Sequence, residues 1–226
     1  MINVLITGDS KGLGRKICID MSKYSNFIVN GLSRGNVNES WNHIVFDLVK
    51  DDVSSLKNVL ANTDVLIHNA AIPSSNIAIV EPIRNYEKVM RLNFYSPVEI
   101  TQAWLKERIK KKKSGTVIFI SSICTKRHFK GLSAYACSKS ALNTYAKTVA
   151  KEMGGRGFQS IVVLPGYMET DMTSEMKGDK IEKIKKITPM KRLSKLSEVS
   201  DVICALAKNP SFINGSEIVV DGGFIL

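Results

Sequence analysis

Two residues spaced as on a helix could carry proton chemistry. Tyr135 and Lys139 are four positions apart in a stretch with a helical pattern, and this spacing places both side chains on one helix face. A free tyrosine, with a pKa of ~10, is a poor acid or base at neutral pH, but a nearby ammonium stabilises the phenolate and lowers that pKa. The pair is therefore expected to donate a proton to a carbonyl undergoing reduction, although the spacing alone is common in helices.

Two further polar residues are candidates for the same site. Ser122 follows the apolar run Thr116–Ile120, so its hydroxyl is expected at the carboxyl edge of a sheet, where open α/β sheets bind ligands. There it could hydrogen-bond a substrate oxygen and stabilise its developing charge, although a serine at a strand end is most often a cap. Asn93 is the fourth candidate, and from the residues alone it is equally a polar residue at a helix terminus.

A glycine-rich turn precedes these residues, immediately after the first apolar run. It reads Thr7-Gly8-Asp9-Ser10-Lys11-Gly12-Leu13-Gly14. Gly8 permits a tight turn, Gly12 lets backbone N–H groups approach a pyrophosphate, and Gly14 lets the following helix pack closely on the strand. The helix N-terminus then faces the phosphates. A glycine triplet is weak evidence alone, but its place between a strand and a helix is the context that a dinucleotide site requires.

The residues at the end of the second expected strand indicate which dinucleotide is bound. NAD-specific folds usually carry an acid about 20 residues past the glycines, near the end of this strand. Here Asn30–Arg34 contains no acid, and the next one is Glu39. Arg34 could bind a 2′-phosphate through its guanidinium fork, and Lys11 could reach the same group. Either cation alone could simply be solvated, but together with the missing acid they favour NADP(H).

Alternating apolar strands and longer helical patterns must position these groups. Several apolar runs are continuous, as in a parallel sheet that is buried on both faces. The alternation predicts an α/β fold with a doubly wound Rossmann-type sheet of about seven strands and helices on both faces, forming a single domain over residues 1–226. The expected strands are Ile2–Ile6, Phe27–Gly31, His43–Phe46, Val65–His68, Thr116–Ile120, Ser160–Leu164 and Glu217–Val220. The expected helices are Gly12–Lys23, Val53–Ala61, Tyr86–Ile109 with a break near Pro97, Ser133–Met153, Glu175–Lys186 and Ser197–Ala207.

Composition limits the remaining function classes. The 226 residues include four scattered cysteines and no CxxC pair, so we expect neither a disulfide framework nor a metal site, and a cytoplasmic protein. His43 and His68 are expected in packing roles. No signal peptide or membrane span is recognisable. The net charge of +11 indicates either a solvated basic surface or an acidic partner. The densest run, Arg108–Lys113, lies at an expected helix end, where cations complement the helix dipole.

The combined pattern resembles the short-chain dehydrogenase/reductase family over nearly the whole chain. Asn93, Ser122, Tyr135 and Lys139 match the family's Asn-Ser-Tyr-Lys tetrad. Further similar segments are the TGxxxGxG turn, His68–Ala71, Asp47, Pro165–Met172, Asn214-Gly215 and Val220–Gly223. Asp9, His68 and Ala71 depart from the family's usual Ala, Asn and Gly, which puts cofactor affinity in question more than the chemistry.

This resemblance implies roles for particular residues. The 4-pro-S hydride of the nicotinamide goes to the carbonyl carbon, Tyr135 gives the proton, and Asn93 holds a water that links Lys139 to solvent. Thr170 contacts the carboxamide, and Asp47 contacts adenine. Together, residues and resemblance predict an NADP(H) site made of Gly8, Ser10, Lys11, Gly12, Leu13, Gly14, Ser33, Arg34, Asp47, Leu48, Asn69, Ala70, Ala71, Tyr135, Lys139, Pro165, Gly166, Met168 and Thr170.

Within the family the chain is most similar to β-ketoacyl-acyl-carrier-protein reductases, notably over Pro165–Met172 and Met190–Val199. That similarity implies a 3-oxoacyl thioester on an acidic carrier protein, which basic side chains would steer, and a homotetramer or dimer. A reductase of a sugar, polyol or phosphorylated intermediate and a non-catalytic NADP-binding regulator remain alternatives. Nucleic-acid and membrane partners are not expected. The candidate steering cations are Lys126, Arg127, Lys130, Lys177, Lys180, Lys183, Lys185 and Lys186.

Overall fold

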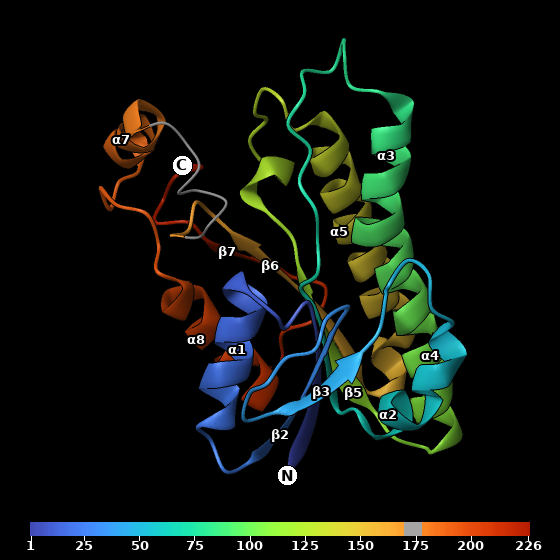
Figure 1. The fold of residues 1–226 in the computed structure, drawn as a ribbon. Helices are drawn as coiled ribbons and strands as arrows, with labels where there is room; N and C mark the ends of the chain where they lie inside the picture. The colour runs from blue at the N-terminus through green and yellow to red at the C-terminus, as the bar shows by residue number, and fades with distance from the viewer. Residues whose placement is uncertain (170–177) are drawn as a thin grey trace.

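The computed structural model describes residues 1–169 and 178–226, and its centre is a seven-stranded sheet (Figure 1). The spatial order is β3-β2-β1-β4-β5-β6-β7, and every neighbouring pair is parallel. The order reverses between β1 and β4, so the crevice for a ligand opens there. The predicted doubly wound Rossmann-type fold is confirmed. The strands are β1 (Ile2–Thr7), β2 (Phe27–Ser33), β3 (Asn42–Val45), β4 (Val65–His68), β5 (Gly115–Ile120), β6 (Phe158–Pro165) and β7 (Glu217–Val220).

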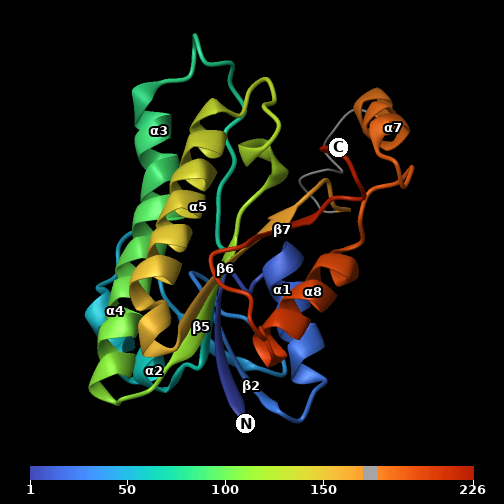
Figure 2. The same cartoon turned by 180° about the vertical axis from the view of Figure 1, so that it is seen from behind.

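Helices cover both faces of this sheet (Figures 1 and 2). One face carries α1 (Gly12–Ser22) and α8 (Leu196–Lys208). The other carries α2 (Lys57–Asn62), α3 (Ile83–Met90), α4 (Ser96–Lys110) and α5 (Ser133–Met153), while α7 (Gly178–Ile187) lies beyond the carboxyl ends of the strands. No helix in the described ranges combines the length and apolarity needed to cross a membrane. Short turns complete the order: η1 (Val53–Leu56), η2 (Arg91–Tyr95), η3 (Ile123–Thr125) and η4 (Gly154–Arg156).

Strand residues alternate between two buried clusters. Val4 and Ile6 of β1 pack towards α1 and α8, whereas Leu5 between them packs towards α4 and α5. The same alternation separates Ile118 from Phe119 in β5. Because successive side chains of a strand point to opposite faces, only a strand that is apolar at every position fills both clusters. This explains the continuous apolar runs in the sequence.

The helical stretch that contains Asn93 differs most from expectation. The sequence predicted one helix over Tyr86–Ile109 with a break near Pro97, whereas α3 starts at Ile83 and passes through a π turn, η2, before α4. In this wide turn Ser96 N–H donates to the Arg91 carbonyl. The ring of a helical proline clashes with the carbonyl four residues earlier, here that of Asn93, and the wider turn relieves this clash. Pro97 itself continues as part of the first turn of α4.

Other differences lie at element ends. The expected helix Val53–Ala61 is the turn η1 followed by the short α2, and Asp52 caps this turn by accepting a hydrogen bond from Ser54 N–H at 2.9 Å. The expected helix Glu175–Lys186 corresponds to α7, whose described part begins at Gly178. Five of the seven expected strands shift at an end by one or two residues, whereas Val65–His68 and Glu217–Val220 match.

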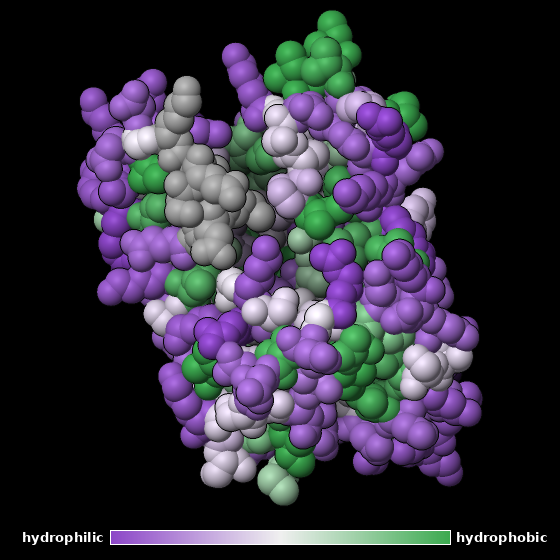
Figure 3. Space-filling view, viewed as in Figure 1, coloured by the Kyte–Doolittle hydropathy of each residue, from purple (hydrophilic) through white to green (hydrophobic). Residues whose placement is uncertain are grey.

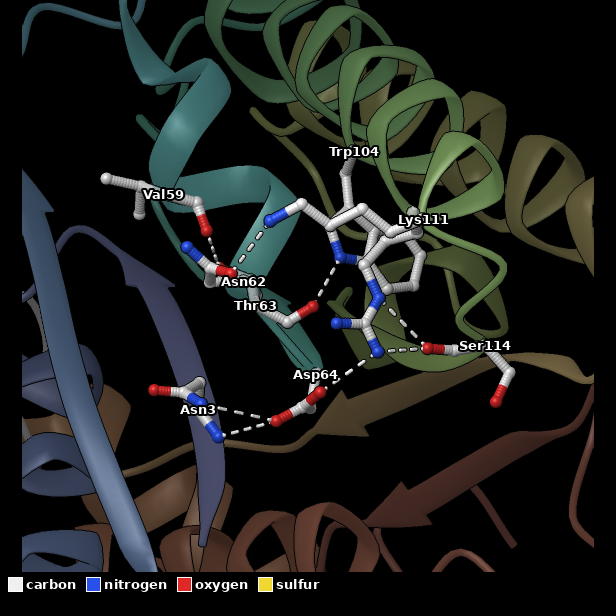
Figure 4. Close-up of polar contacts among 9 residues, drawn as sticks. Asn3, Val59, Asn62, Thr63, Asp64, Trp104, Lys111 and Ser114 are labelled. Atoms are coloured by element: carbon white, nitrogen blue, oxygen red, sulfur yellow. Dashed lines mark hydrogen bonds and ion pairs between the residues drawn. The ribbon is translucent and has the colours of Figure 1, made fainter.

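A polar network at the amino edge of the sheet joins β1, β4 and the end of α4 (Figure 4). The buried Arg108 guanidinium pairs with Asp64 at 2.9 Å and donates to the Ser114 carbonyl. Asp64 also accepts from Asn3 N–H, and the Trp104 indole donates to the Thr63 carbonyl at 2.8 Å. The basic run Arg108–Lys113 therefore begins with a structural cation, as the sequence predicted.

Candidate active site

The glycine turn lies at the crevice between β1 and β4 and is shaped by close backbone contacts. Gly8 and Gly12 have φ of +76° and +57°, values that side-chain-bearing residues rarely adopt. A Cβ on Gly14 would lie 2.1 Å from the Gly8 carbonyl oxygen, whereas a Cβ on Gly12 would meet open space. The Asn69 amide donates to the carbonyls of Thr7 and Gly8 at 3.1 and 3.2 Å. Together these contacts leave an open cradle at the N-terminus of α1, which fits a dinucleotide phosphate.

The end of β2 carries the expected adenosine-side groups. Arg34 and Lys11 are exposed, while the Ser33 hydroxyl is buried and has no partner within the described ranges. The nearest acid along the chain, Glu39, is paired with Arg15 of α1. The end of β2 and the glycine turn therefore each contribute one exposed cation, Arg34 and Lys11. The Asp47 carboxylate accepts from Val49 N–H at 2.9 Å, so it holds the turn that presents Leu48.

Asp9 and His43 form a cluster that the sequence did not predict. Asp9 is fully buried and accepts hydrogen bonds from Trp41 Nε1 at 2.9 Å and from His43 Nδ1 at 2.7 Å. The Asp9 carboxylate therefore points inward, and its effect on cofactor affinity stays a prediction. His43 is likewise more than a packing residue. His68 does pack as expected: it stacks on Phe119 and bonds Thr101 Oγ1 at 2.8 Å.

Tyr135 and Lys139 begin α5, one helical turn apart. Lys139 is 2% exposed, and its ammonium donates to the Ile120 carbonyl at 2.7 Å and lies 5.8 Å from the centre of the Tyr135 ring. Burial lowers the pKa of Lys139 to about 8. Burial also raises the pKa of Tyr135, against a smaller lowering by the Ser122 hydroxyl. A raised pKa keeps the phenol protonated at neutral pH, and the lowering of the Tyr135 pKa by Lys139 stays a prediction.

Ser122 and Asn93 reach the same region from different elements. Ser122 follows β5 and caps η3, where its Oγ accepts from Cys124 N–H at 3.2 Å. It therefore also acts as a cap, the usual role of a serine at a strand end. Asn93 is buried in η2; its amide exchanges two 2.9 Å hydrogen bonds with the backbone of Ile72 and donates to Ser138 Oγ at 3.1 Å.

The expected nicotinamide side is only partly described. Pro165 ends β6, Gly166 N–H donates to the Val220 carbonyl at 2.9 Å, and Met168 bridges to Ser194. A Cβ on Gly166 would lie 2.7 Å from the Cβ of Asp221, so only glycine lets β6 and the C-terminal segment come this close. Thr170, together with Asp171, Met172 and Lys177, lies outside the described residues.

An aromatic cluster was missing from the sequence analysis. Phe129, Tyr167 and Phe224 come from three separate segments, and their ring centres lie 5.3 to 5.9 Å apart. Arg127 stacks on Phe224 at 4.9 Å and donates to its carbonyl. Sequence periodicity could not reveal this cluster because all three residues lie outside regular elements. It places an apolar wall beside the segment that leads into Tyr135.

Several expected steering cations have structural partners instead. Lys126 and Lys147 both pair with Glu217 at 2.5 Å, and Lys185 pairs with Glu182. Lys180, Lys183 and Lys186 remain exposed on α7, where hydrophilic side chains dominate the surface (Figure 3). A shallow hollow of about 450 Å³ lies there, lined by Glu182, Lys183, Lys185, Lys186 and Lys191.

Known proteins resemble the chain along its length. Residues 47–225 match a family model described as enoyl-(acyl carrier protein) reductase. The 3-oxoacyl-[acyl-carrier-protein] reductase FabG of Rickettsia prowazekii is 30% identical, over 98% of this chain and 96% of that protein. A solved structure titled as a putative β-ketoacyl-ACP reductase superposes with a TM-score of 0.88 at 24% identity, covering 100% of this chain and 98% of that one. A putative 2-deoxy-D-gluconate 3-dehydrogenase from Agrobacterium tumefaciens with bound NADP superposes with 0.89 at 23% identity, covering 99% and 96%.

The buried Lys139 ammonium should destabilise the cofactor-free protein. Its pKa falls to about 8 on folding from ~10.4 in an unfolded chain. Between these values the unfolded chain binds more protons, so the stability of the wild type rises with pH across this window. We expect Lys139→Met to raise the free energy of unfolding by about 1–2 kcal/mol near neutral pH, and this gain to shrink by about pH 10.5.

Urea unfolding without cofactor measures this difference. The matched control is Lys151→Met, which changes an exposed lysine of the same helix and should show no comparable pH-dependent gain. A Lys139→Met protein that is less stable than the wild type at neutral pH would contradict the assignment of a buried, weakly compensated ammonium.

Proposed function

The chain belongs to the short-chain dehydrogenase/reductase family, and from this premise we propose that it uses NADPH to reduce the 3-oxo group of an acyl thioester carried on an acyl carrier protein. The single observation that carries the proposal is the convergence of Ser122, Tyr135 and Lys139 at the carboxyl edge of the sheet. The similarity to 3-oxoacyl-[acyl-carrier-protein] reductases extends over 98% of the chain and supports the choice of substrate.

The proposed chemistry uses a neutral phenol as the acid. NADPH, when bound, supplies the hydride. Tyr135 is protonated at neutral pH because burial raises its pKa, so it can donate a proton to the oxygen of a carbonyl being reduced. Ser122 lies close enough to lower that pKa, and its hydroxyl is placed to hydrogen-bond the same oxygen. Lys139 keeps a positive charge beside the phenol and is the residue placed to hold the nicotinamide ribose.

The adenosine side supports NADPH over NADH. Gly8, Gly12 and Gly14 form the phosphate cradle, with the N-terminus of α1 directed at it. Arg34 and Lys11, both exposed, are the cations for a 2′-phosphate. Glu39, the acid nearest along the chain, is engaged by Arg15. A 2′-phosphate would therefore meet donors and positive charge, as charge-assisted recognition requires.

The surroundings of Tyr135 favour an apolar substrate over a sugar. The wall formed by Phe129, Tyr167 and Phe224 presents rings, which suit an acyl chain. A second apolar surface covers the loop before α3, at the top of the molecule (Figure 3). This loop also touches the active site, since the Ser74 hydroxyl accepts from Tyr135 N–H at 3.2 Å. The exposed apolar residues of the loop and of the start of α3 are Ile77, Ile79, Val80 and Ile83.

A substrate panel tests this function. We expect turnover of acetoacetyl thioesters with NADPH that exceeds turnover with NADH and with sugars, polyols or polyol phosphates. Tyr135→Phe should reduce kcat by about 10²- to 10⁴-fold, since it removes the proton donor, while NADPH binding measured by fluorescence stays intact. Crotonyl thioester, an enoyl substrate, serves as the control for reduction of a carbon–carbon double bond. Turnover of a sugar but of no 3-oxoacyl thioester would contradict the proposal and support a sugar reductase instead.

Docking of an acidic carrier protein on α7 is tested by charge reversal. A Lys183→Glu/Lys186→Glu variant should raise the KM for a 3-oxoacyl-carrier-protein substrate by about tenfold, because complementary charge steers association. The KM for the N-acetylcysteamine thioester of the same acyl group, which carries no charge, should not change. Lys208→Glu is the control, since Lys208 ends α8 at the opposite edge of the sheet. Equal effects on both substrates would contradict docking on α7.

A further inference from the structure

A buried, hydrogen-bonded pair of side chains, Asp9 and His43, lies beneath the loop that follows β2. The Asp9 carboxylate has no exposure, and its Oδ2 accepts from His43 Nδ1 at 2.7 Å. The other ring nitrogen, His43 Nε2, lies 2.7 Å from the carbonyl oxygen of Gly35. Asp9 belongs to the glycine turn, His43 to β3, and Gly35 to the loop just after Arg34. Three segments that surround the adenosine side are therefore joined through one imidazole ring.

Both ring nitrogens of His43 face oxygen acceptors. The Asp9 carboxylate lies at Nδ1 and the Gly35 carbonyl lies at Nε2, so a ring that makes both hydrogen bonds donates from both nitrogens. The ring then holds the glycine turn and the loop after β2 in one fixed arrangement.

The sequence around the pair accommodates it. A Cβ on Gly31 would lie 1.9 Å from Asp9 Oδ2, so the strand residue opposite Asp9 has to be glycine. Trp41 Nε1 donates to the same carboxylate at 2.9 Å. The loop between β2 and β3 is further tied to α1 by the Arg15–Glu39 pair. An acid in the phosphate turn thus comes with an imidazole, an indole and a glycine that fit it.

His43 also orients the loop that holds Arg34. Its bond turns the Gly35 carbonyl inward. The C=O and N–H of one trans peptide point in opposite directions, so the Asn36 N–H points away from His43. Holding this peptide fixes the path of the chain on either side, including Arg34 and the end of β2 at Ser33. The loop is then preorganised for an anion before any ligand arrives, which lowers the entropic cost of binding.

We propose that His43 is a positioning residue for the 2′-phosphate: its ring links Asp9 of the glycine turn to Gly35 and so sets the loop that presents Arg34. The inference rests on the NADP preference in the proposed function. It assigns His43 no contact with the nucleotide. The predicted consequence is selective, because the pair governs the loop around the 2′-position and leaves the glycine cradle for the pyrophosphate intact.

Binding of 2′,5′-ADP and 5′-ADP to the full chain, measured by calorimetry, tests the proposal. In the wild type 2′,5′-ADP should bind more tightly. His43→Gln should raise the Kd for 2′,5′-ADP by about tenfold, as expected for loss of a charge-assisted link, and leave the Kd for 5′-ADP nearly unchanged. In turnover, the KM for NADPH should rise while kcat stays constant. His43→Asn should behave in the same way.

Two further variants separate the possible outcomes. Trp41→Phe removes another hydrogen bond to Asp9 but not the link to Gly35, so the preference for 2′,5′-ADP should persist. Arg34→Asp should abolish it by removing the direct ligand. A preference lost in Arg34→Asp but kept in His43→Gln would overturn the positioning role alone and leave the proposed function standing. Equal weakening of both nucleotides in His43→Gln would also overturn it, whereas a wild type without preference would overturn both.

Discussion

The rest of the structure depends on the reversal of the strand order between β1 and β4. At this point consecutive units of the sheet diverge, with α1 crossing to one face and the following elements to the other. The separated strand ends leave backbone groups that a continuous sheet would have paired. Asn69 satisfies two of them by donating to the carbonyls of Thr7 and Gly8, while Thr7 Oγ1 accepts from the N–H groups of Asn69 and Ala70. These four bonds hold the phosphate turn open and fix its orientation.

At the same edge of the sheet lies a buried charge that lowers the stability of the folded chain. Lys139 is buried, donates to one carbonyl oxygen, and has no carboxylate partner among the described residues. Burial lowers the pKa of His68 to about 3, and the charge of Lys139 contributes a smaller part of this lowering. The neutral imidazole of His68 then stacks on Phe119 as a packing group. A buried charge that costs stability and is surrounded by neutral groups is typical of a functional site.

The sequence predicted what depends on periodicity and spacing. All seven strands followed from apolar runs, and the placement of Tyr135 and Lys139 on one helix followed from their four-residue interval. It could not predict features made by side chains that meet from distant segments. The cluster of Phe129, Tyr167 and Phe224 lies outside regular elements, and Asp9 approaches His43 only because β3 lies beside β2. The π turn at Asn93 arises from Pro97 within a continuous helix, whereas a proline is usually taken as a helix end.

The distribution of charge explains why a net charge of +11 is a poor measure of what the surface offers a ligand. Arg108 is buried in an ion pair with Asp64 at the amino edge of the sheet. Lys126 and Lys147 share Glu217, and His43 is held between Asp9 and Gly35. Such pairs fix the chain and leave little field at a distance. The cations that remain exposed include Lys11 and Arg34 beside the glycine turn and the lysines of α7. Exposed positive charge therefore lies both beside the glycine turn and on α7, which is where the proposed reduction of a carrier-bound thioester with NADPH would require it.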